Sequence, residues 1–231
     1  MAQFAAEFFA HLEDSVRGLG VVSSDLTAPE VLPRVLKDWF TIFWHVIRAT
    51  DLLLNHAVAR LVSHPDDEFH RLLCQFYRHK IEEEAGHDEM LHGDLVKLGV
   101  TEEQLTRSLA AAPVAAMIGS QYYFIDFCHP CSLLGYLGLA EGHPVPLPQL
   151  EHVIKISKAP ADAWSTYRMH AEVDPWHRQE LEEMLDRIPN DSFLRGAIVT
   201  NALRSAEYYC QALEELRDRA AAWIRSALRH S

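Results

Sequence analysis

Apolar residues recur at intervals of three and four along almost the whole chain, which is the spacing of one face of an α-helix. No Asn-Gly or Asp-Gly pair joins two segments of alternating apolar and polar residues, so the sequence gives no signal for a β-hairpin. The pattern predicts an all-α protein, a bundle of seven to eight helices. No linker rich in proline, glycine or serine interrupts it, and we expect residues 1–231 to form one domain.

Glycine, proline and capping residues divide this pattern into segments. A first helix should cover residues 2–18 and end at Gly18 or Gly20, and a second should run from Pro29 to the Ser63-His64-Pro65 segment. Asp191 is placed to cap the last helix. The later expected segments are helices over 67–98, 148–157, 161–187 and 192–228, a helix opened by the capping box at 101–104, and an apolar stretch over 113–140 that is interrupted at Pro130.

The densest group of metal-binding residue types lies in the helix expected over 161–187. His170, Asp174 and His177 follow one another at i, i+4 and i+7. At roughly 100° per residue they lie near 0°, 40° and −20° around the helix axis, so all three point to the same side. Two imidazoles and a carboxylate on one face can hold a transition metal. The alternative interpretation is an Asp–His hydrogen-bonding network at the surface.

Two other segments offer further ligands. Glu84 and His87 are three residues apart on the helix expected over 67–98, with Gly86 between them removing bulk beside the metal. Glu141 ends the apolar segment over 131–141, where a carboxylate has few other uses. The alternatives are a solvated acidic face for the first pair and an exposed helix end for Glu141.

Several residues of the region 83–92 could serve as the ligands. Glu83 lies four residues before His87, and His92 follows Glu84 by eight residues, so either could replace its neighbour. His79 and His92 are more typical of surface positions. Pro175 lies inside the ligand helix and cannot donate a hydrogen bond to Ala171, so a kink or π-bulge could change the angle between Asp174 and His177.

The order Glu-x-x-His, then a lone Glu, then His-x3-Asp-x2-His resembles the heme-oxygenase-like diiron oxidases and oxygenases, which share the TenA/PqqC-like fold. The neighbouring segments Leu98-Gly99 and Leu139-Ala140-Glu141-Gly142 match as well, and the resemblance spans about residues 70–180. It implies a heme-oxygenase-like fold. It also implies six metal ligands, which fall on Glu84, His87, Glu141, His170, Asp174 and His177.

The resemblance further implies a cofactor of two Fe(II)/Fe(III) ions, with O₂ as cosubstrate. Manganese accepts the same ligands and stays open. In such enzymes a peroxo-diferric intermediate cleaves a C–H bond or oxidises an amine of a small metabolite, such as an amino acid or a fatty acid. An external electron donor and a homodimer also stay open, as do the substrate and product.

Composition narrows the remaining choices. The net charge of −12 argues against nucleic acid and anionic membranes as partners. Four cysteines without a disulfide pattern favour a reducing cytoplasm. The first residues do not resemble a signal peptide, and no apolar run reaches the ~18 residues that a membrane span needs. We therefore expect a cytoplasmic enzyme that acts on a small-molecule substrate.

Three other functions are alternatives to the diiron enzyme. A thiaminase-type (TenA-like) hydrolase would use a cysteine nucleophile, for which the chain offers four candidates, but it would leave the six ligands unexplained. A heme oxygenase would need an axial histidine in the first helix, where His11 lies. A non-catalytic metal-binding protein would hold the same ligands without a substrate cavity. The candidate nucleophiles are Cys74, Cys128, Cys131 and Cys210.

Overall fold

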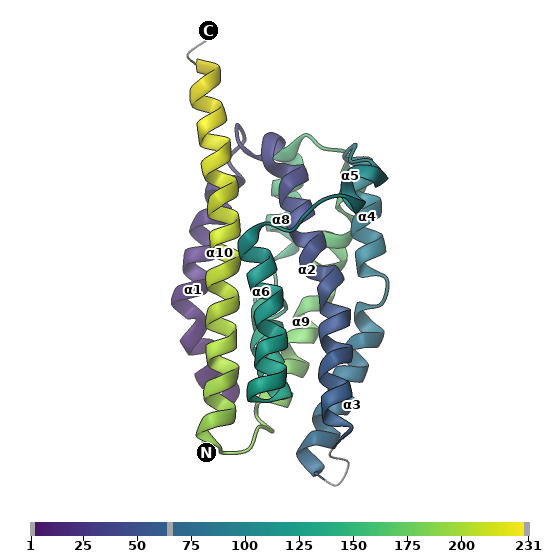
Figure 1. Ribbon diagram of the computed structural model, residues 1–231. Helices are drawn as coiled ribbons and strands as arrows, with labels where there is room; N and C mark the ends of the chain where they lie inside the picture. The colour runs from purple at the N-terminus through teal and green to yellow at the C-terminus, as the bar shows by residue number, and fades with distance from the viewer. Residues whose placement is uncertain (1–2, 64–66, 229–231) are drawn as a thin grey trace.

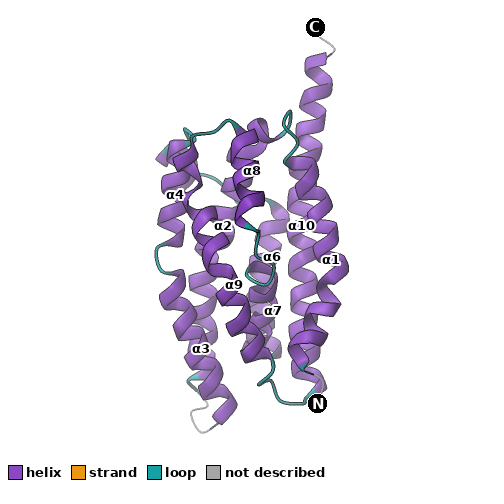
Figure 2. Cartoon of the chain, turned by 180° about the vertical axis from the view of Figure 1, so that it is seen from behind, coloured by secondary structure: helices purple, strands orange, loops and turns teal. Residues whose placement is uncertain are grey.

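The computed structural model describes residues 3–63 and 67–228. Within these ranges every regular element is helical and no strand occurs, which confirms the all-α prediction (Figure 2). Residue 2 and the His64-Pro65 pair, where two expected helix ends fall, lie outside the described ranges. No helix of the described ranges is long and apolar enough to cross a membrane.

The longer helices form the bundle, and short helical segments connect them (Figure 1). The elements are α1 (Phe4–Leu26), α2 (Leu32–Leu61), α3 (Glu68–Glu84), α4 (His87–Lys97), α5 (Glu102–Thr106), α6 (Ala112–Tyr123), the π-helix η1 (Phe124–Cys128), the 3₁₀-helices η2 (Pro130–Ser132) and η3 (Ala161–Trp164), α7 (Leu133–Ala140), α8 (Leu147–Ser157), α9 (Ser165–Leu185) and α10 (Ser192–Leu228).

The first helix is longer than its glycines predict. Helix α1 continues through Gly18 and Gly20 and ends only at Leu26. Each glycine costs a helix about 1 kcal/mol relative to alanine. Burial of Val22 and Leu26 in the last turns offsets that cost, since each buried side chain contributes roughly 1.5–3 kcal/mol.

The helix expected over 67–98 is two helices. Helix α3 ends at Glu84 and α4 begins at His87, because Gly86 between them has a φ of 84° that only glycine adopts readily. A Cβ at this position would meet no atom within 4 Å, so packing against other residues does not require glycine, and the expectation that Gly86 makes room beside a metal stays a prediction. Glycine is needed here for its backbone conformation.

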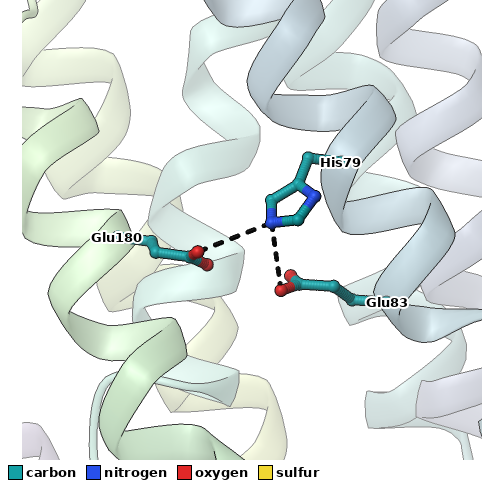
Figure 3. A group of neighbouring side chains, drawn as sticks. All are labelled: His79, Glu83 and Glu180. Carbon is teal, nitrogen blue, oxygen red and sulfur yellow. Dashed lines mark ion pairs between the residues drawn. The ribbon is translucent and has the colours of Figure 1, made fainter.

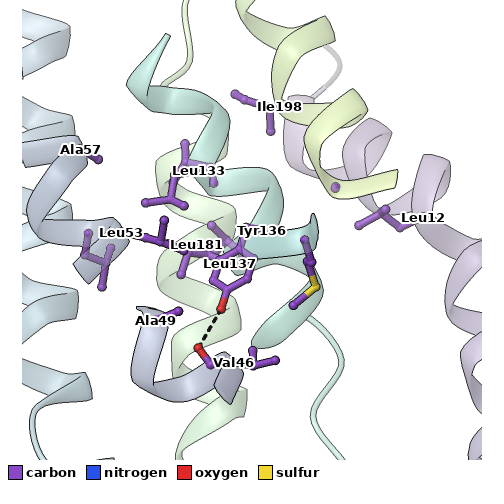
Figure 4. Packing of buried hydrophobic residues seen from close by; sticks show 14 of the residues in the cluster. Leu12, Val46, Ala49, Leu53, Ala57, Leu133, Tyr136, Leu137, Leu181 and Ile198 are labelled. Atoms are coloured by element: carbon purple, nitrogen blue, oxygen red, sulfur yellow. Dashed lines mark hydrogen bonds between the residues drawn. The ribbon is translucent and has the colours of Figure 1, made fainter. Parts of the chain in front are cut away.

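Helix α7 is the most deeply buried part of the apolar stretch, which Pro130 interrupts as predicted. Its Tyr136 hydroxyl lies 2.8 Å from Thr50 Oγ1 of α2. It also donates to the backbone oxygen of Val46 on the same helix (Figure 4). A Cβ on Gly135 would lie 2.2 Å from the backbone oxygen of Ile198, so only glycine lets α7 approach α10 this closely. This packing fixes the end of α7, where Glu141 follows.

Helix α9 crosses the bundle between the α3–α4 column and the α1–α10 pair (Figure 2). The expected helix over 161–187 begins as the 3₁₀-helix η3, and α9 then runs through Pro175 without interruption. Its first turn is anchored by the buried Asp94 of α4, which accepts hydrogen bonds from the Thr166 backbone N–H at 2.8 Å and from the Ser165 hydroxyl. Asp94 therefore sets the position of α9 relative to α4.

Two local predictions of helix starts are confirmed and one is displaced. Helix α2 starts at Leu32 rather than near Pro29, and Pro33 takes the place expected for Pro29 in its first turn. Thr101 and Gln104 form both hydrogen bonds of a capping box at α5. The Asp191 side chain accepts the backbone N–H groups of residues 193 and 194 at the start of α10. Helix α10 runs the height of the bundle and extends beyond it (Figure 1).

Candidate metal centre

The six residues chosen from the sequence lie on three parts of the bundle that meet at one buried place. Glu84 is the last residue of α3 and His87 the first of α4, so the Gly86 turn brings both side chains to the same side. Glu141 follows the last residue of α7. The other three, His170, Asp174 and His177, come from α9.

Short contacts connect these side chains. His87 Nδ1 lies 3.1 Å from Glu84 Oε2, and the rings of His87 and His170 have centroids 5.1 Å apart. Ligand atoms of Glu84, Glu141 and His177 all lie within 4.8 Å of one another, an arrangement that could hold a metal ion. Together these contacts place the carboxylates and imidazoles of α3, α4, α7 and α9 in one cluster.

Asp174 lies close to both histidines of α9. His170 Nδ1 lies 3.2 Å and His177 Nδ1 3.6 Å from Asp174 Oδ1. These two contacts show that the three side chains share a face of α9 despite Pro175, so the concern about the angle between Asp174 and His177 is resolved. Carboxylates that hold imidazoles in this way are common around protein metal sites.

Two imidazole nitrogens in the cluster lack a hydrogen-bond partner. His170 Nε2 and His177 Nδ1 are buried, and neither forms a hydrogen bond with any described residue. A buried polar nitrogen without a partner costs stability unless something binds it. A metal ion would satisfy such a nitrogen, and a mixed set of carboxylates and imidazoles is the donor set that iron or manganese accepts. The residues therefore fit a metal site.

Burial and hydrogen bonding shift the acid strengths in the cluster in opposite directions. Burial raises the pKa of Glu141 to about 7, against the effect of the neighbouring Lys80 ammonium. Burial also disfavours the charge on Glu84, but the hydrogen bond with His87 outweighs it and lowers the pKa of Glu84. The pKa of Asp174 is lowered in the same way by His170 and His177.

The pKa of the His177 imidazole, a base of the cluster, is shifted as well. Burial disfavours the charge on His177, but Asp174 and the Glu141 carboxylate outweigh burial and raise the pKa of its imidazole. The carboxylates thus draw positive charge toward themselves, as the residues of a cation site do.

Lys80 is the residue that sequence reasoning missed. Its side chain is fully buried, and its ammonium lies 2.9 Å from Glu83, 3.1 Å from Glu141 and 3.3 Å from Glu180. The signal was present in the sequence, because Lys80 lies four residues before Glu84, on the same helical face as the buried Leu73 and Tyr77. A charged residue within a buried stripe needs ionic partners.

A second group of possible ligands lies nearer the surface. His79 Nε2 is 3.2 Å from Glu83 and 3.5 Å from Glu180, and the three could hold a metal ion (Figure 3). The same two carboxylates already neutralise Lys80 from the other side. We therefore interpret this group as the ion-paired surroundings of Lys80.

Glu83 and His92, the alternative ligands to Glu84 and His87, lie in different surroundings. Glu83 contacts Lys80 and His79, and its carboxylate is 3.7 Å from His177 Nε2. His92 points elsewhere and lies 2.6 Å from Glu102 of α5. Of these two residues, only Glu83 borders the cluster.

A cavity of about 560 Å³ opens beside the cluster. It is formed by α1, α2, the end of α7, the loop after Glu141, α8 and α9, and both His170 and Asp174 line it. Its volume lies in the range of small-molecule binding sites. A ligand in this cavity would lie directly against two residues of the cluster.

Neither the cysteines nor His11 is among the described residues that line this cavity, which disfavours the cysteine-dependent hydrolase and the heme oxygenase. None of the described residues that line the cavity is a cysteine. Cys74 and Cys131 are buried, and burial raises the pKa of Cys131, which makes its thiol a poor nucleophile. His11 is exposed on α1 and is not among the described residues that line the cavity.

Solved structures share this fold. A domain of unknown function with a heme oxygenase-like fold from Shewanella denitrificans superposes with a TM-score of 0.68, at 19% identity over 96% of this chain and 95% of its own. A TenA homolog from Pseudomonas syringae pv. tomato gives a TM-score of 0.66, at 12% identity over 90% of this chain and 92% of its own. At these identities the likeness concerns the fold alone. The fold is thus heme oxygenase-like, as the resemblance implied.

Sequence comparison identifies the family of the chain in addition to its fold. No curated protein matches the chain. The model of one family, described as iron-containing redox enzyme, matches residues 37–209, which include all six residues of the cluster. Because this match covers most of the chain, the protein belongs to the iron-containing redox enzyme family.

Proposed function

We propose that the protein is an O₂-dependent non-heme diiron oxidase or oxygenase of a small metabolite. Family membership supports iron and redox chemistry. The observation that carries the rest is the convergence of six carboxylate and imidazole side chains, two of them with unpartnered buried nitrogens, at the wall of a cavity.

In this proposal Glu84, His87, Glu141, His170, Asp174 and His177 hold the two ions. When bound, the irons supply the activation of O₂ that lets a C–H bond be cleaved or an amine be oxidised. Manganese fits the same ligands, and the metal content of the purified protein would distinguish the two.

The chain's own residues prepare the site. Asp174 holds the ring of His170 through its Nδ1 atom at 3.2 Å, and the same carboxylate lies 3.6 Å from Nδ1 of His177. Lys80 holds one oxygen of Glu141 in place from the side of α3. The apolar residues of the cavity wall would hold an apolar part of the substrate beside His170.

Anaerobic titration with Fe(II) tests the proposal. The unaltered protein should bind two equivalents, and each of His87→Ala, His170→Ala and His177→Ala should bind fewer. His92→Ala is the matched control, because His92 lies on α4 like His87 but pairs with Glu102, and it should still bind two. If His170→Ala and His177→Ala both keep two irons, the ligand assignment is wrong.

A further inference from the structure

Three side chains of metal-binding type lie at the surface directly outside the cluster. His79 and Glu83 come from α3, and Glu180 comes from α9 (Figure 3). One ligand atom of each lies within 4.8 Å of the other two, which is close enough to hold a metal ion between them. The His79 side chain is 53% exposed, so a cation in solvent can reach these three residues, which we call the outer group.

The two carboxylates of the outer group each divide their oxygens between two partners. Lys80 is close to both Oε2 atoms, 2.9 Å from that of Glu83 and 3.3 Å from that of Glu180. The two Oε1 atoms face the His79 imidazole, at 3.2 Å and 3.5 Å from its Nε2. Three ligand atoms thus remain on the solvent side of Lys80. We expect them to bind a divalent cation weakly and reversibly, because the ligands are few and an ammonium lies near.

Glu83 connects the outer group to the cluster. The Oε1 atom that lies 3.2 Å from His79 Nε2 also lies 3.7 Å from Nε2 of His177. His177 in turn offers a ligand atom within 4.8 Å of those of Glu84 and Glu141. The exposed fraction of the side chain falls along this line, from 53% for His79 through 22% for Glu83 to 7% for His177. A cation that follows it can exchange water for protein ligands in stages, which avoids burying a bare charge.

The cluster can be approached from two directions. The cavity reaches it at His170 and Asp174, and none of the described residues that line the cavity belongs to the outer group. The outer group reaches it at His177, which follows His170 by seven residues, or about 10 Å along α9. The two approaches therefore meet the cluster at different ends of its α9 ligands.

We propose that the outer group is the entry site for metal ions, where a divalent cation from solvent binds first and from which it passes by way of Glu83 to His177. The cavity is then left to the substrate. The inference rests on the proposed function in treating the cluster as the metal centre. It gives His79 and Glu180 a role in the rate of metal uptake and none in holding the ions once they have arrived.

The rate of metal uptake tests the entry site. Metal-free protein is mixed with excess Co(II) in a stopped-flow instrument near pH 8, where imidazoles are mostly uncharged, and the visible absorption of protein-bound Co(II) is followed. His79→Ala should slow uptake at least about fivefold, because converging ligands raise the local concentration of cations, and the final stoichiometry should stay at two. His92→Ala is the matched control, since this histidine pairs with Glu102, and it should not change the rate. Unchanged uptake by His79→Ala would overturn the proposal.

A second pair of variants separates the outer group from the general attraction of an acidic surface. Glu180→Gln and Glu183→Gln remove the same charge from the same helix, but Glu183 is exposed and accepts a hydrogen bond from Gln179. Only Glu180→Gln should slow Co(II) uptake, by at least about threefold, because only Glu180 offers an oxygen to the outer group. Equal slowing by both variants would show long-range attraction without an entry site and refute the inference.

Gly20→Trp tests the alternative route through the cavity. Gly20 lines the cavity, and a Cβ there would meet no atom within 4 Å, so tryptophan can be accommodated and would partly fill the space. We expect Co(II) uptake by this variant at the unaltered rate. Slower uptake by Gly20→Trp together with unchanged uptake by His79→Ala would place the entry in the cavity and overturn the proposal.

The rate and the endpoint of uptake separate this inference from the proposed function. Protein that binds two metal ions at a rate independent of the outer group overturns the entry site alone. Protein that loads metal through the outer group but consumes no O₂ in its iron form overturns the proposed oxidase or oxygenase alone. Protein that takes up no metal overturns both.

Discussion

At the scale of single residues, Lys80 is a buried cation with three carboxylate partners. Its ammonium is buried among carboxylates from α3, the end of α7 and α9. Burial disfavours its charge, but Glu141 and Glu83 outweigh burial and raise the pKa of Lys80. The residue therefore stays charged and connects three parts of the bundle that carry the cluster.

Replacing Lys80 by methionine tests this role. Lys80→Met keeps the length of the side chain but leaves three carboxylates without their shared cation, so the metal-free protein should lose about 3–5 kcal/mol in urea unfolding. Adding Glu180→Gln should recover part of the loss, because one uncompensated charge is removed. Lys155→Met, at an exposed position of α8, serves as the control and should change stability by less than about 0.5 kcal/mol. A loss below about 1 kcal/mol for Lys80→Met would contradict the ionic role.

At the scale of elements, the break between α3 and α4 decides how Glu84 and His87 meet. On one continuous helix the two side chains would be about 60° apart around the axis. With the turn at Gly86 they come from two helices, and their polar atoms lie 3.1 Å apart. The break therefore belongs to the cluster, and the helical spacing alone did not predict it.

Glycine variants on either side of His87 separate backbone conformation from helix propensity. Gly86→Ala should destabilise the protein by about 1–2 kcal/mol, because its φ of 84° is unfavourable for a residue with a Cβ. Gly93→Ala, within α4 and with no atom within 4 Å of its Cβ, should instead stabilise it by up to about 1 kcal/mol. Thermal unfolding measures both. Two changes of the same sign would show that the turn is not held in the left-handed conformation.

At the scale of the whole molecule, the cluster connects elements that are distant in sequence. The α3–α4 turn, the end of α7 and the middle of α9 are not joined by a short stretch of chain near the site. The start of α9 is anchored to α4 by the hydrogen bonds that Asp94 accepts. Metal ions bound by all six residues would cross-link these elements.

Loading with Zn(II), which is redox-inert, should therefore stabilise the fold. At a free metal concentration one hundred times Kd, each site adds about 2.7 kcal/mol. Amide hydrogen exchange should slow more in α9 than in α10, since α10 contributes none of the six residues, and a chelator should reverse the effect. Equal slowing in both helices, or no slowing, would speak against a cross-linking metal site.

The sequence by itself determined the helical class, most helix positions and the candidate ligands. These depend on relations within one segment, such as the 3.6-residue period, the capping groups of Thr101 and Asp191, and the spacing of His170, Asp174 and His177 on one helix. Such relations are local, so they can be recognised without knowing what the segment packs against.

Only the tertiary structure decided the partners of Lys80, the break at Gly86 and the walls of the cavity. Lys80 meets Glu141 and Glu180, which lie 61 and 100 residues away in sequence, and no local pattern specifies that meeting. A glycine within a helical pattern can be tolerated or can end the helix, and packing on both sides selects the outcome. The cavity arises where five helices fail to fill the space between them, which is a property of their joint packing.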